Sequence, residues 1–370
     1  MTHASGLLPG DLAPSFHAAA LNGNPNYAFD TVGGRHVLLF FFGSAAVPQA
    51  AKALSLVNAH GAIFNDAQAC FFGITNDPDD EKLGRIAPSI PGRRYFLDYD
   101  RAVTTLYTLH PSLQKERHAW VLLDPMLRVV ATFPLENGET ALAVTAQLSR
   151  VEPSPSHAPA LIVPRILEPS LCAKLIALYQ AGVPEESGFM REVDGRTMLQ
   201  HDAGHKVRTD LIIEDLRWMR LLRDCIARRL APQIEKSFQF EATRMERYLI
   251  ACYKAENGGH FAPHRDNTTK GTAHRRFAVT INLNAQDYDG GDLSFPEFGN
   301  QTYRAPTGGA IVFSCSLLHK VSIVTAGTRF AFLPFLYDDA AATLREANNI
   351  YLGPTTPHYI PGNDMLPQFF

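Results

Sequence analysis

Cysteine is scarce in this chain. Five of the 370 residues are cysteines, at positions 70, 172, 225, 252 and 315, and no two of them form a CxxC pair. An odd number of widely spaced cysteines argues against a disulfide framework, and the absence of paired spacing argues against a zinc knuckle. The pattern is typical of a protein in a reducing compartment, so we expect a cytoplasmic location.

The sequence also lacks a basic excess and a long hydrophobic run. Its formal net charge is −3, whereas non-specific binding to nucleic acid depends on surplus positive charge. An apolar run such as Val37–Phe42 is far too short to cross a bilayer, and no basic segment followed by an apolar core opens the chain. The sequence therefore predicts neither a nucleic-acid partner nor a membrane anchor.

Two domains are expected, because 370 residues exceed what a single hydrophobic core usually supports. The run EPSPSHAP at 152–159 is rich in proline and serine and has no hydrophobic period, which is typical of a linker. We therefore place an N-terminal domain at 1–151 and a C-terminal domain at 160–370.

The N-terminal domain alternates short apolar segments with amphipathic ones. Residues 36–42 and 70–75 have the composition of buried parallel strands, residues 50–60 that of a helix, and residues 120–133 that of a hairpin. This order predicts an α/β thioredoxin-like fold. The domain also resembles the peroxiredoxin branch of that fold, in PGDLAPSF at 9–16 and in GITNDPDD at 73–80.

The catalytic thiol of that branch is missing. After the strand ending FFFG the sequence runs SAAVP, and Val47 takes the place of the family's peroxidatic cysteine. Neither Val47 nor Ser44 can form the thiolate that the chemistry needs. Cys70 opens an apolar strand, and we expect it to be buried and inert. The sequence thus predicts a redox-inactive domain that binds the substrate of the second domain or forms a homo-oligomer.

The C-terminal domain contains a candidate metal site. His264 and Asp266 form an H-x-D motif, and on a β-strand this spacing turns both side chains to one face. His319 ends an apolar segment and is placed to supply a third ligand. Two imidazoles and one carboxylate form the facial triad that holds non-haem Fe(II). Ten residues further on, Arg329 offers a guanidinium suited to a bidentate grip on a carboxylate.

Three blocks resemble, in the same order, the iron- and 2-oxoglutarate-dependent dioxygenases, specifically the branch of prolyl 4-hydroxylases and PKHD-type hydroxylases. They are HRDN at 264–267, DYDGGDL at 287–293 and SLLHKVSIVTAGTRFAF at 316–332. The resemblance implies a C-terminal double-stranded β-helix, or jelly roll, with flanking helices. Short β-rich segments broken by glycine and proline from residue 245 onward favour the same architecture.

The resemblance also implies roles for individual residues. The family's metal ligands correspond to His264, Asp266 and His319. The family's residue that binds the far carboxylate of 2-oxoglutarate corresponds to Arg329. Tyr253 corresponds to a tyrosine that hydrogen-bonds 2-oxoglutarate, and Arg208 to a substrate-binding arginine. The implied cofactors are Fe(II), 2-oxoglutarate and O2, with ascorbate left open. The implied reaction is hydroxylation of an unactivated C–H bond with release of succinate and CO2.

Several alternatives remain open from the sequence. The substrate is a prolyl-type residue of a peptide or protein, or else a free amino acid or small metabolite. A non-catalytic sensor that binds iron and 2-oxoglutarate is disfavoured by the intact ligand set. The polar stretch Glu185–Lys206 fits a lid over the site or a surface loop. We expect four further histidines to be solvated, and not to form a second metal site: His201, His205, His260 and His274.

Overall fold

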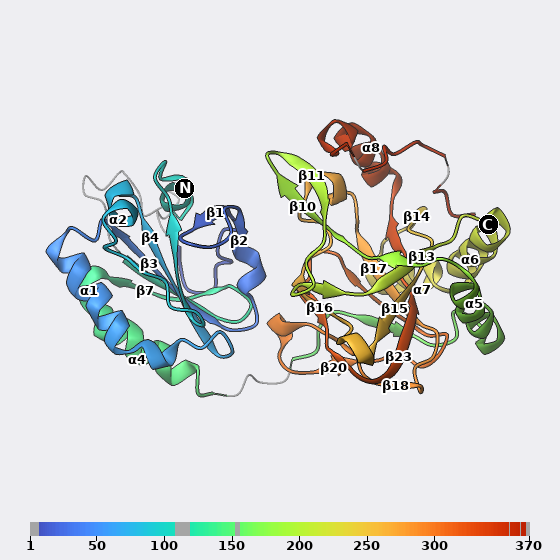
Figure 1. Cartoon of the computed structure of the whole chain (residues 1–370), viewed down its shortest axis with the longest axis horizontal. Coiled ribbons are helices and arrows are strands. Elements are labelled where there is room, and N and C mark those ends of the chain that lie inside the picture. The colour runs from blue at the N-terminus through green and yellow to red at the C-terminus, as the bar shows by residue number, and fades with distance from the viewer. Residues whose placement is uncertain (1–6, 108–118, 152–155, 355, 363, 368–370) are drawn as a thin grey trace. The chain divides into compact units, whose positions relative to one another are not determined.

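The computed structural model (Figure 1) describes residues 7–107, 119–151, 156–354, 356–362 and 364–367. Clustering of contacts divides the chain into two compact units, one of residues 1–156 with 296–300 and one of residues 157–295 with 301–370. Half of the expected linker, residues 152–155, lies outside the described residues. No helix in the described ranges is both long enough and apolar enough to span a membrane.

The N-terminal unit is built on a seven-stranded sheet with the order β2-β1-β5-β4-β3-β6-β7. Strands β3, β4 and β5 run parallel, and β6 and β7 form an antiparallel hairpin beside β3. This is the thioredoxin-like arrangement that the sequence predicts. The strands are β1 (His17–Ala20), β2 (Tyr27–Ala28), β3 (His36–Gly43), β4 (Ala69–Thr75), β5 (Arg93–Leu97), β6 (Ala119–Leu123) and β7 (Val129–Pro134).

Both faces of this sheet are covered, which explains why its central strands are apolar along their whole length. On one face, helices α1 (Pro48–Ala59) and α4 (Gly138–Leu148) pack over Phe40 and Trp120, whose rings stack with their centres 3.7 Å apart. On the other face, the ring of Phe72 stacks on that of Phe96, with ring centres 4.8 Å apart. Two short helices complete the unit: α2 (Pro78–Lys82) and α3 (Ala102–Leu106).

The position at which the resemblance expects a catalytic cysteine is well defined. Val47 is the residue before α1, and Pro48 is the first residue of the helix. Nearby, the Ser44 hydroxyl donates a hydrogen bond to the Asp77 carboxylate at 2.6 Å. Cys70 lies in β4, is 1% exposed, and has its pKa raised to about 12 by burial. The cysteine is therefore buried, as predicted, and its thiolate is disfavoured.

The C-terminal unit consists of two sheets and the helices that flank them. The larger one, here the major sheet, has the order β14-β24-β17-β23-β15-β13-β9, with β18, β21 and β8 attached. Its strands are β8 (Leu161–Val163), β9 (Glu185–Glu186), β13 (Thr209–Ile212), β14 (Arg244–Glu246), β15 (Leu249–Lys254), β17 (Phe277–Asn282), β18 (Tyr288–Gly290), β21 (Ala310–Ser314), β23 (Val324–Phe332) and β24 (Phe335–Tyr337).

The smaller one, here the minor sheet, has five strands. Their order is β12 (Lys206–Val207), β16 (His260–His264), β22 (His319–Val321), β19 (Leu293–Ser294) and β20 (Thr302–Tyr303). Along the chain, the strands pass back and forth between the major and the minor sheet. Two antiparallel sheets connected in this way form the jelly roll that the sequence predicts. A separate hairpin joins β10 (Phe189–Val193) to β11 (Arg196–Gln200).

Helices cover the outer face of the major sheet. Outward residues such as Ile250, Ile281 and Phe332 pack in one apolar core with helices α5 (Pro169–Ala181), α6 (Leu216–Arg229) and α7 (Ala231–Phe238). A further helix, α8 (Asp339–Ala347), follows the last strand. Because side chains alternate along a strand, the residues between the outward ones face the interior of the roll. Tyr253 and Arg329 are among these inward residues.

The thiols provide the first prediction. All five cysteines are free and buried, so Ellman's reagent should find fewer than one reactive thiol in the native chain and five in concentrated guanidinium chloride, because only unfolding exposes them. The native protein should also consume no hydrogen peroxide with dithiothreitol as reductant. Peroxide consumption that a Cys70→Ser variant loses would contradict the redox-inactive assignment, and Cys172→Ser is the matched control.

Candidate metal centre

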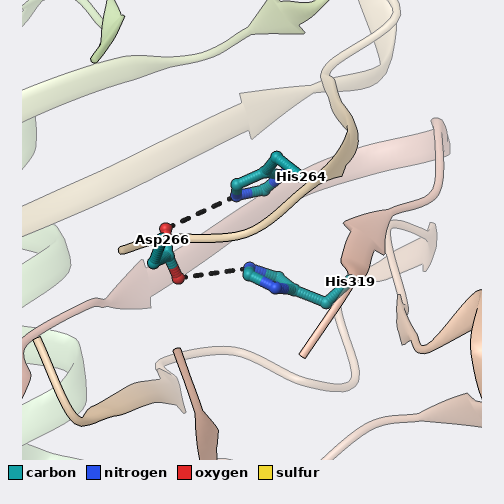
Figure 2. A group of neighbouring side chains, drawn as sticks. All are labelled: His264, Asp266 and His319. Carbon is teal, nitrogen blue, oxygen red and sulfur yellow. Dashed lines mark ion pairs between the residues drawn. The ribbon is translucent and has the colours of Figure 1, made fainter. Parts of the chain in front are cut away.

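The candidate ligands point toward one another (Figure 2). His264 ends β16 and His319 begins β22, and the two residues lie opposite each other in the antiparallel pairing. Nε2 of His264 lies 3.6 Å from Oδ1 of Asp266, and Nε2 of His319 lies 3.3 Å from Oδ2. All three ligand atoms fall within 4.8 Å of one another. The sequence-predicted triad is therefore brought together in space.

Asp266 reaches this position differently from what its spacing suggests. The expectation was a continuous strand carrying both members of the H-x-D motif, but β16 ends at His264 and Asp266 lies in the turn that follows. The backbone N–H of Asp266 donates to the carbonyl of Cys315 at 2.9 Å. This bond holds the turn after β16 against the segment that precedes β22, and so fixes the backbone that carries the carboxylate.

The tautomers of both histidines follow from their backbone contacts. Nδ1 of His264 lies 2.8 Å from the carbonyl oxygen of Ala262, and Nδ1 of His319 lies 3.0 Å from that of Leu317. A carbonyl oxygen can only accept, so each Nδ1 carries the hydrogen. In the neutral rings the lone pairs therefore sit on Nε2 and point at the Asp266 carboxylate.

The charges of these three side chains also suit a bound cation. Burial, with the nearby His319, lowers the pKa of His264 to about 4, so this imidazole is neutral at neutral pH. Burial opposes ionisation of Asp266, yet positive charge on His319 and hydrogen bonds from both imidazoles, which require a proton on Nε2, hold the pKa of its carboxyl well below the usual range. Lone pairs facing an ionised carboxylate repel one another unless a proton or a metal ion lies between them. Two imidazole nitrogens and one carboxylate suit Fe(II).

Aromatic rings wall this site. Phe261 stacks on His264 with ring centres 3.5 Å apart, and Phe313 lies edge-on to His319 at 4.6 Å. Such apolar walls fix the imidazole planes and limit access of water. No second cluster of three or more metal-ligating side chains occurs in the described part of the chain.

A buried arginine lies deeper in the roll. Tyr253 and Arg329 are opposite each other on β15 and β23, and the guanidinium carbon of Arg329 is 5.0 Å from the centre of the tyrosine ring. Arg329 is 3% exposed, and its Nη2 donates to Oγ1 of Thr280 at 3.1 Å. Among the described residues, its Nε and Nη1 have no hydrogen-bond partner. Unpaired buried donors are costly, so this fork is suited to an anionic ligand.

Arg208 also reaches this region, but its charge is already paired. Its Nη2 donates to Oδ2 of Asp210 at 2.6 Å and to Oγ of Ser187 at 2.9 Å, and its Nη1 donates to the Tyr253 hydroxyl at 3.2 Å. The structure thus places Arg208 beside Tyr253, and its role toward a substrate stays a prediction.

Sequence analysis missed a buried polar cluster behind the metal-site turn. Glu246 accepts from Nε of Arg275 at 2.7 Å and pairs with Arg345 and His274 at 2.5 and 3.1 Å. His274 is 2% exposed, so the expectation that it is solvated was wrong. Arg275 also donates to the carbonyl of Asp266 at 3.4 Å. The cluster therefore braces the turn that carries the carboxylate ligand.

The expected lid segment contains the hairpin β10–β11. Phe189 at its base lies 4.4 Å from the ring of His205. Farther along, Thr197 accepts the N–H of Gly271 on its hydroxyl and the N–H of Gly353 on its carbonyl, both at 2.9 Å. The segment is thus a hydrogen-bonded hairpin anchored at Thr197, and its motion stays a prediction.

Known proteins match the C-terminal unit. Residues 248–337 match the model of the 2OG-Fe(II) oxygenase superfamily. The chain is 37% identical over 89 residues to a PKHD-type hydroxylase of Synechococcus sp. (strain JA-2-3B'a(2-13)), covering 22% of this chain and 39% of that protein. It is 28% identical over 174 residues to a PKHD-type hydroxylase of Paracoccus denitrificans (strain Pd 1222), covering 42% of this chain and 75% of that protein.

Solved structures match each unit at low identity. A prolyl hydroxylase of Trichoplax adhaerens, in complex with a peptide fragment, is 19% identical with a TM-score of 0.37, covering 50% of this chain and 86% of that one. The peroxidoxin BcpB of Mycobacterium tuberculosis is 18% identical with a TM-score of 0.31, covering 39% and 99%. The order and direction of the strands in each sheet identify the two folds. The C-terminal unit contains, over residues 248–337, a 2OG-Fe(II) oxygenase domain related to those of PKHD-type hydroxylases.

Proposed function

We propose that this chain is an Fe(II)- and 2-oxoglutarate-dependent dioxygenase that hydroxylates an unactivated C–H bond and releases succinate and CO2. One observation carries the proposal. Two imidazole lone pairs and an ionised carboxylate converge in an aromatic-walled site, in the same roll as a buried guanidinium with two unpartnered nitrogens. The chain spans less than half of the Synechococcus relative that it matches, so activity and substrate are inferred from the site.

The residues divide the work between them. Nε2 of His264, a carboxylate oxygen of Asp266 and Nε2 of His319 would hold the iron. When bound, the iron supplies the chemistry by which O2 and the keto acid oxidise a C–H bond. The unpaired donors of Arg329 would bind the far carboxylate of 2-oxoglutarate, and the bond from its Nη2 to Thr280 fixes the plane of the guanidinium.

Tyr253, on the strand next to that of Arg329, would orient the cosubstrate. Its ring faces the Arg329 guanidinium, and its hydroxyl, which accepts from Arg208, retains a hydrogen that can donate to a ligand oxygen. Phe261 and Phe313 keep the ligand atoms away from bulk water. A dry site strengthens each of these electrostatic contacts.

The substrate class is the finer part of the proposal. A prolyl-type residue in a peptide is favoured by the resemblance to prolyl hydroxylases, and a free amino acid or small metabolite is the alternative. Among proteins of another class, an iron- and 2-oxoglutarate-binding sensor would bind both ligands without turnover. Release of succinate separates that sensor from both enzymes.

The N-terminal unit is proposed to be an accessory without redox chemistry. Val47 stands before α1, at the place of a peroxidatic cysteine, and Cys70 is buried with a raised pKa. The unit would bind substrate or form a homo-oligomer in a cytoplasmic enzyme.

Loss of a metal ligand tests the proposed function. His264→Ala or Asp266→Ala should lower 2-oxoglutarate-dependent succinate release at least about 100-fold, because even changes to residues behind metal ligands cost up to about that much. Anaerobic titration should find about one Fe(II) per wild-type chain and much weaker binding in both variants. His201→Ala, at an exposed histidine, should match the wild type. Full activity in either ligand variant would refute the triad.

Loss of the arginine fork should act on the cosubstrate. Arg329→Ala should raise the 2-oxoglutarate concentration needed for half-maximal succinate release by about two to three orders of magnitude, since breaking a buried charge pair costs about 3–5 kcal/mol. Arg329→Lys keeps the charge but loses the fork, so a smaller increase is expected. Arg217→Gln, on an exposed side chain of α6, is the control. An unchanged 2-oxoglutarate requirement in Arg329→Ala would remove this assignment.

A further inference from the structure

Lys206 is a buried cation beside the metal centre. It opens β12 and lies opposite Phe261 in the pairing with β16. Its side chain is buried, its Nζ donates to the carbonyl of Gly188 at 2.6 Å, and this atom lies 4.7 Å from the centre of the Phe261 ring. The same ring stacks on His264. One aromatic ring thus separates the ammonium group from a proposed iron ligand, and Lys206 has no carboxylate partner in the described part of the chain.

Arg247 is a second cation without a full partner. It follows β14 in the left-handed backbone conformation, with φ of 67°, and its guanidinium lies 5.2 Å over the ring of Phe335. Its side chain is 27% exposed, and its nearest carboxylate is that of Asp210, 3.8 Å from Nη2 to Oδ2. That oxygen already accepts from Arg208 and Ser187. Within the described ranges, Arg247 makes no hydrogen bond.

The other cations near the site have carboxylate partners. Arg208 pairs with Asp210, and Arg275 and Arg345 pair with Glu246. With its ligands bound, the two charges of Fe(II) and the one of Arg329 would offset Asp266 and the two carboxylates of 2-oxoglutarate. In the described part of the chain, Lys206 is then left without a counterion, and Arg247 shares the single carboxylate of Asp210 with Arg208.

Burial of Lys206 and partial burial of Arg247 make both charges unfavourable in the free protein. Burial lowers the pKa of Lys206 well below the usual range and, with the nearby Arg208, lowers the pKa of Arg247 to about 10. An anion placed against both groups would remove that cost, because a buried charge is tolerated when it is paired. The Phe261 ring lies between Lys206 and His264. Arg247 lies over Phe335, and the same ring contacts Arg275, which donates to the Asp266 carbonyl. An anion against either cation would therefore lie close to the reacting centre.

We propose that the substrate carries a carboxylate, which binds against Lys206 and Arg247 next to the metal centre. This inference rests on the proposed function and narrows its substrate class. The guanidinium of Arg247 offers a fork for two carboxylate oxygens, and the ammonium of Lys206 offers donors that its single bond to Gly188 leaves over. The carboxylate belongs to an acidic side chain of a peptide or to a free amino acid.

Matched probe pools test the inference. One pool holds capped peptides with a central proline flanked by aspartate or glutamate, and the second holds the same peptides with asparagine or glutamine. A third and fourth hold free amino acids and their primary amides. Binding to the anaerobic Fe(II)·2-oxoglutarate complex is read from its visible absorption band, and gain of one oxygen atom is read in air by mass spectrometry.

Carboxylate probes should bind at least about tenfold more tightly than their amides, as one charge-assisted pair predicts. Whether the preference occurs among peptides or among free amino acids identifies the source. Arg247→Gln and Lys206→Met should each reduce it, and Arg247→Lys should retain part of it. Arg217→Gln, whose arginine is exposed on α6 and paired with Asp215, should preserve it. Arg247 is partly exposed, so its variants test the inference even if Lys206→Met fails to fold.

Three outcomes would overturn the inference. The first is an equal response of the wild type to carboxylate and amide pools, including no response to either. The second is a preference that survives in both Arg247→Gln and Lys206→Met. The third is a 2-oxoglutarate requirement that rises in Arg247→Gln as it should in Arg329→Ala, because these cations would then hold the cosubstrate. Absence of succinate from the wild type would instead refute the proposed function.

Discussion

The pairing of β16 with β22 is the constraint on which the site depends. It sets His264 opposite His319, and the bond from the Asp266 N–H to the Cys315 carbonyl holds the turn that follows β16. A slip of one residue in a β-ladder turns every side chain to the other face. Such a slip here would separate the two imidazoles and move the carboxylate away from both. The register of one short strand pair therefore decides whether a metal site exists.

The apolar packing outside the roll makes the polar interior possible. Ile250, Ile281 and Phe332 anchor the major sheet against its helices, so its stability does not require the inward residues to be apolar. The inward positions can then hold Tyr253, Thr280 and Arg329, whose polar groups would be costly in an ordinary core. Some of these groups have partners within the chain, and others, such as Nε and Nη1 of Arg329, do not. The unpaired groups are the ones that a ligand can satisfy.

The sequence was informative where the site is encoded locally. His264 and Asp266 are two residues apart, and His319 and Arg329 flank one strand pattern, so spacing and residue type were enough to single them out. The turn at Asp266 could not be foreseen, because a long-range backbone bond to Cys315 holds it. The buried state of His274 depends on Glu246, which precedes it by a long stretch of chain. Local composition around His274 is polar and carries no trace of that contact.

Lys206 and Arg247 were missed for the same physical reason. Nothing in the sequence near Lys206 indicates that β12 will pair with β16 and bring the side chain over Phe261. Arg247 lies between two strands, where a charged residue is unremarkable until its backbone and its neighbours are known. In both cases, function depends on which charges lack partners after folding, and pairing is a property of tertiary structure. Residue type and spacing can therefore locate a reaction centre sooner than they can identify its substrate.

The N-terminal unit shows the converse case, in which the packing of a fold does not depend on a catalytic thiol. Its sheet is stabilised from both sides by aromatic packing, as in the stack of Phe40 on Trp120, and none of that packing needs a thiol before α1. Val47 lies outside the helix that it precedes, with Pro48 in the first helical position, where the missing N–H costs nothing. Replacing a reactive cysteine by valine at such a position removes a nucleophile and leaves the core intact. Loss of activity is therefore compatible with full retention of the fold, and any role of this unit has to come from its surface.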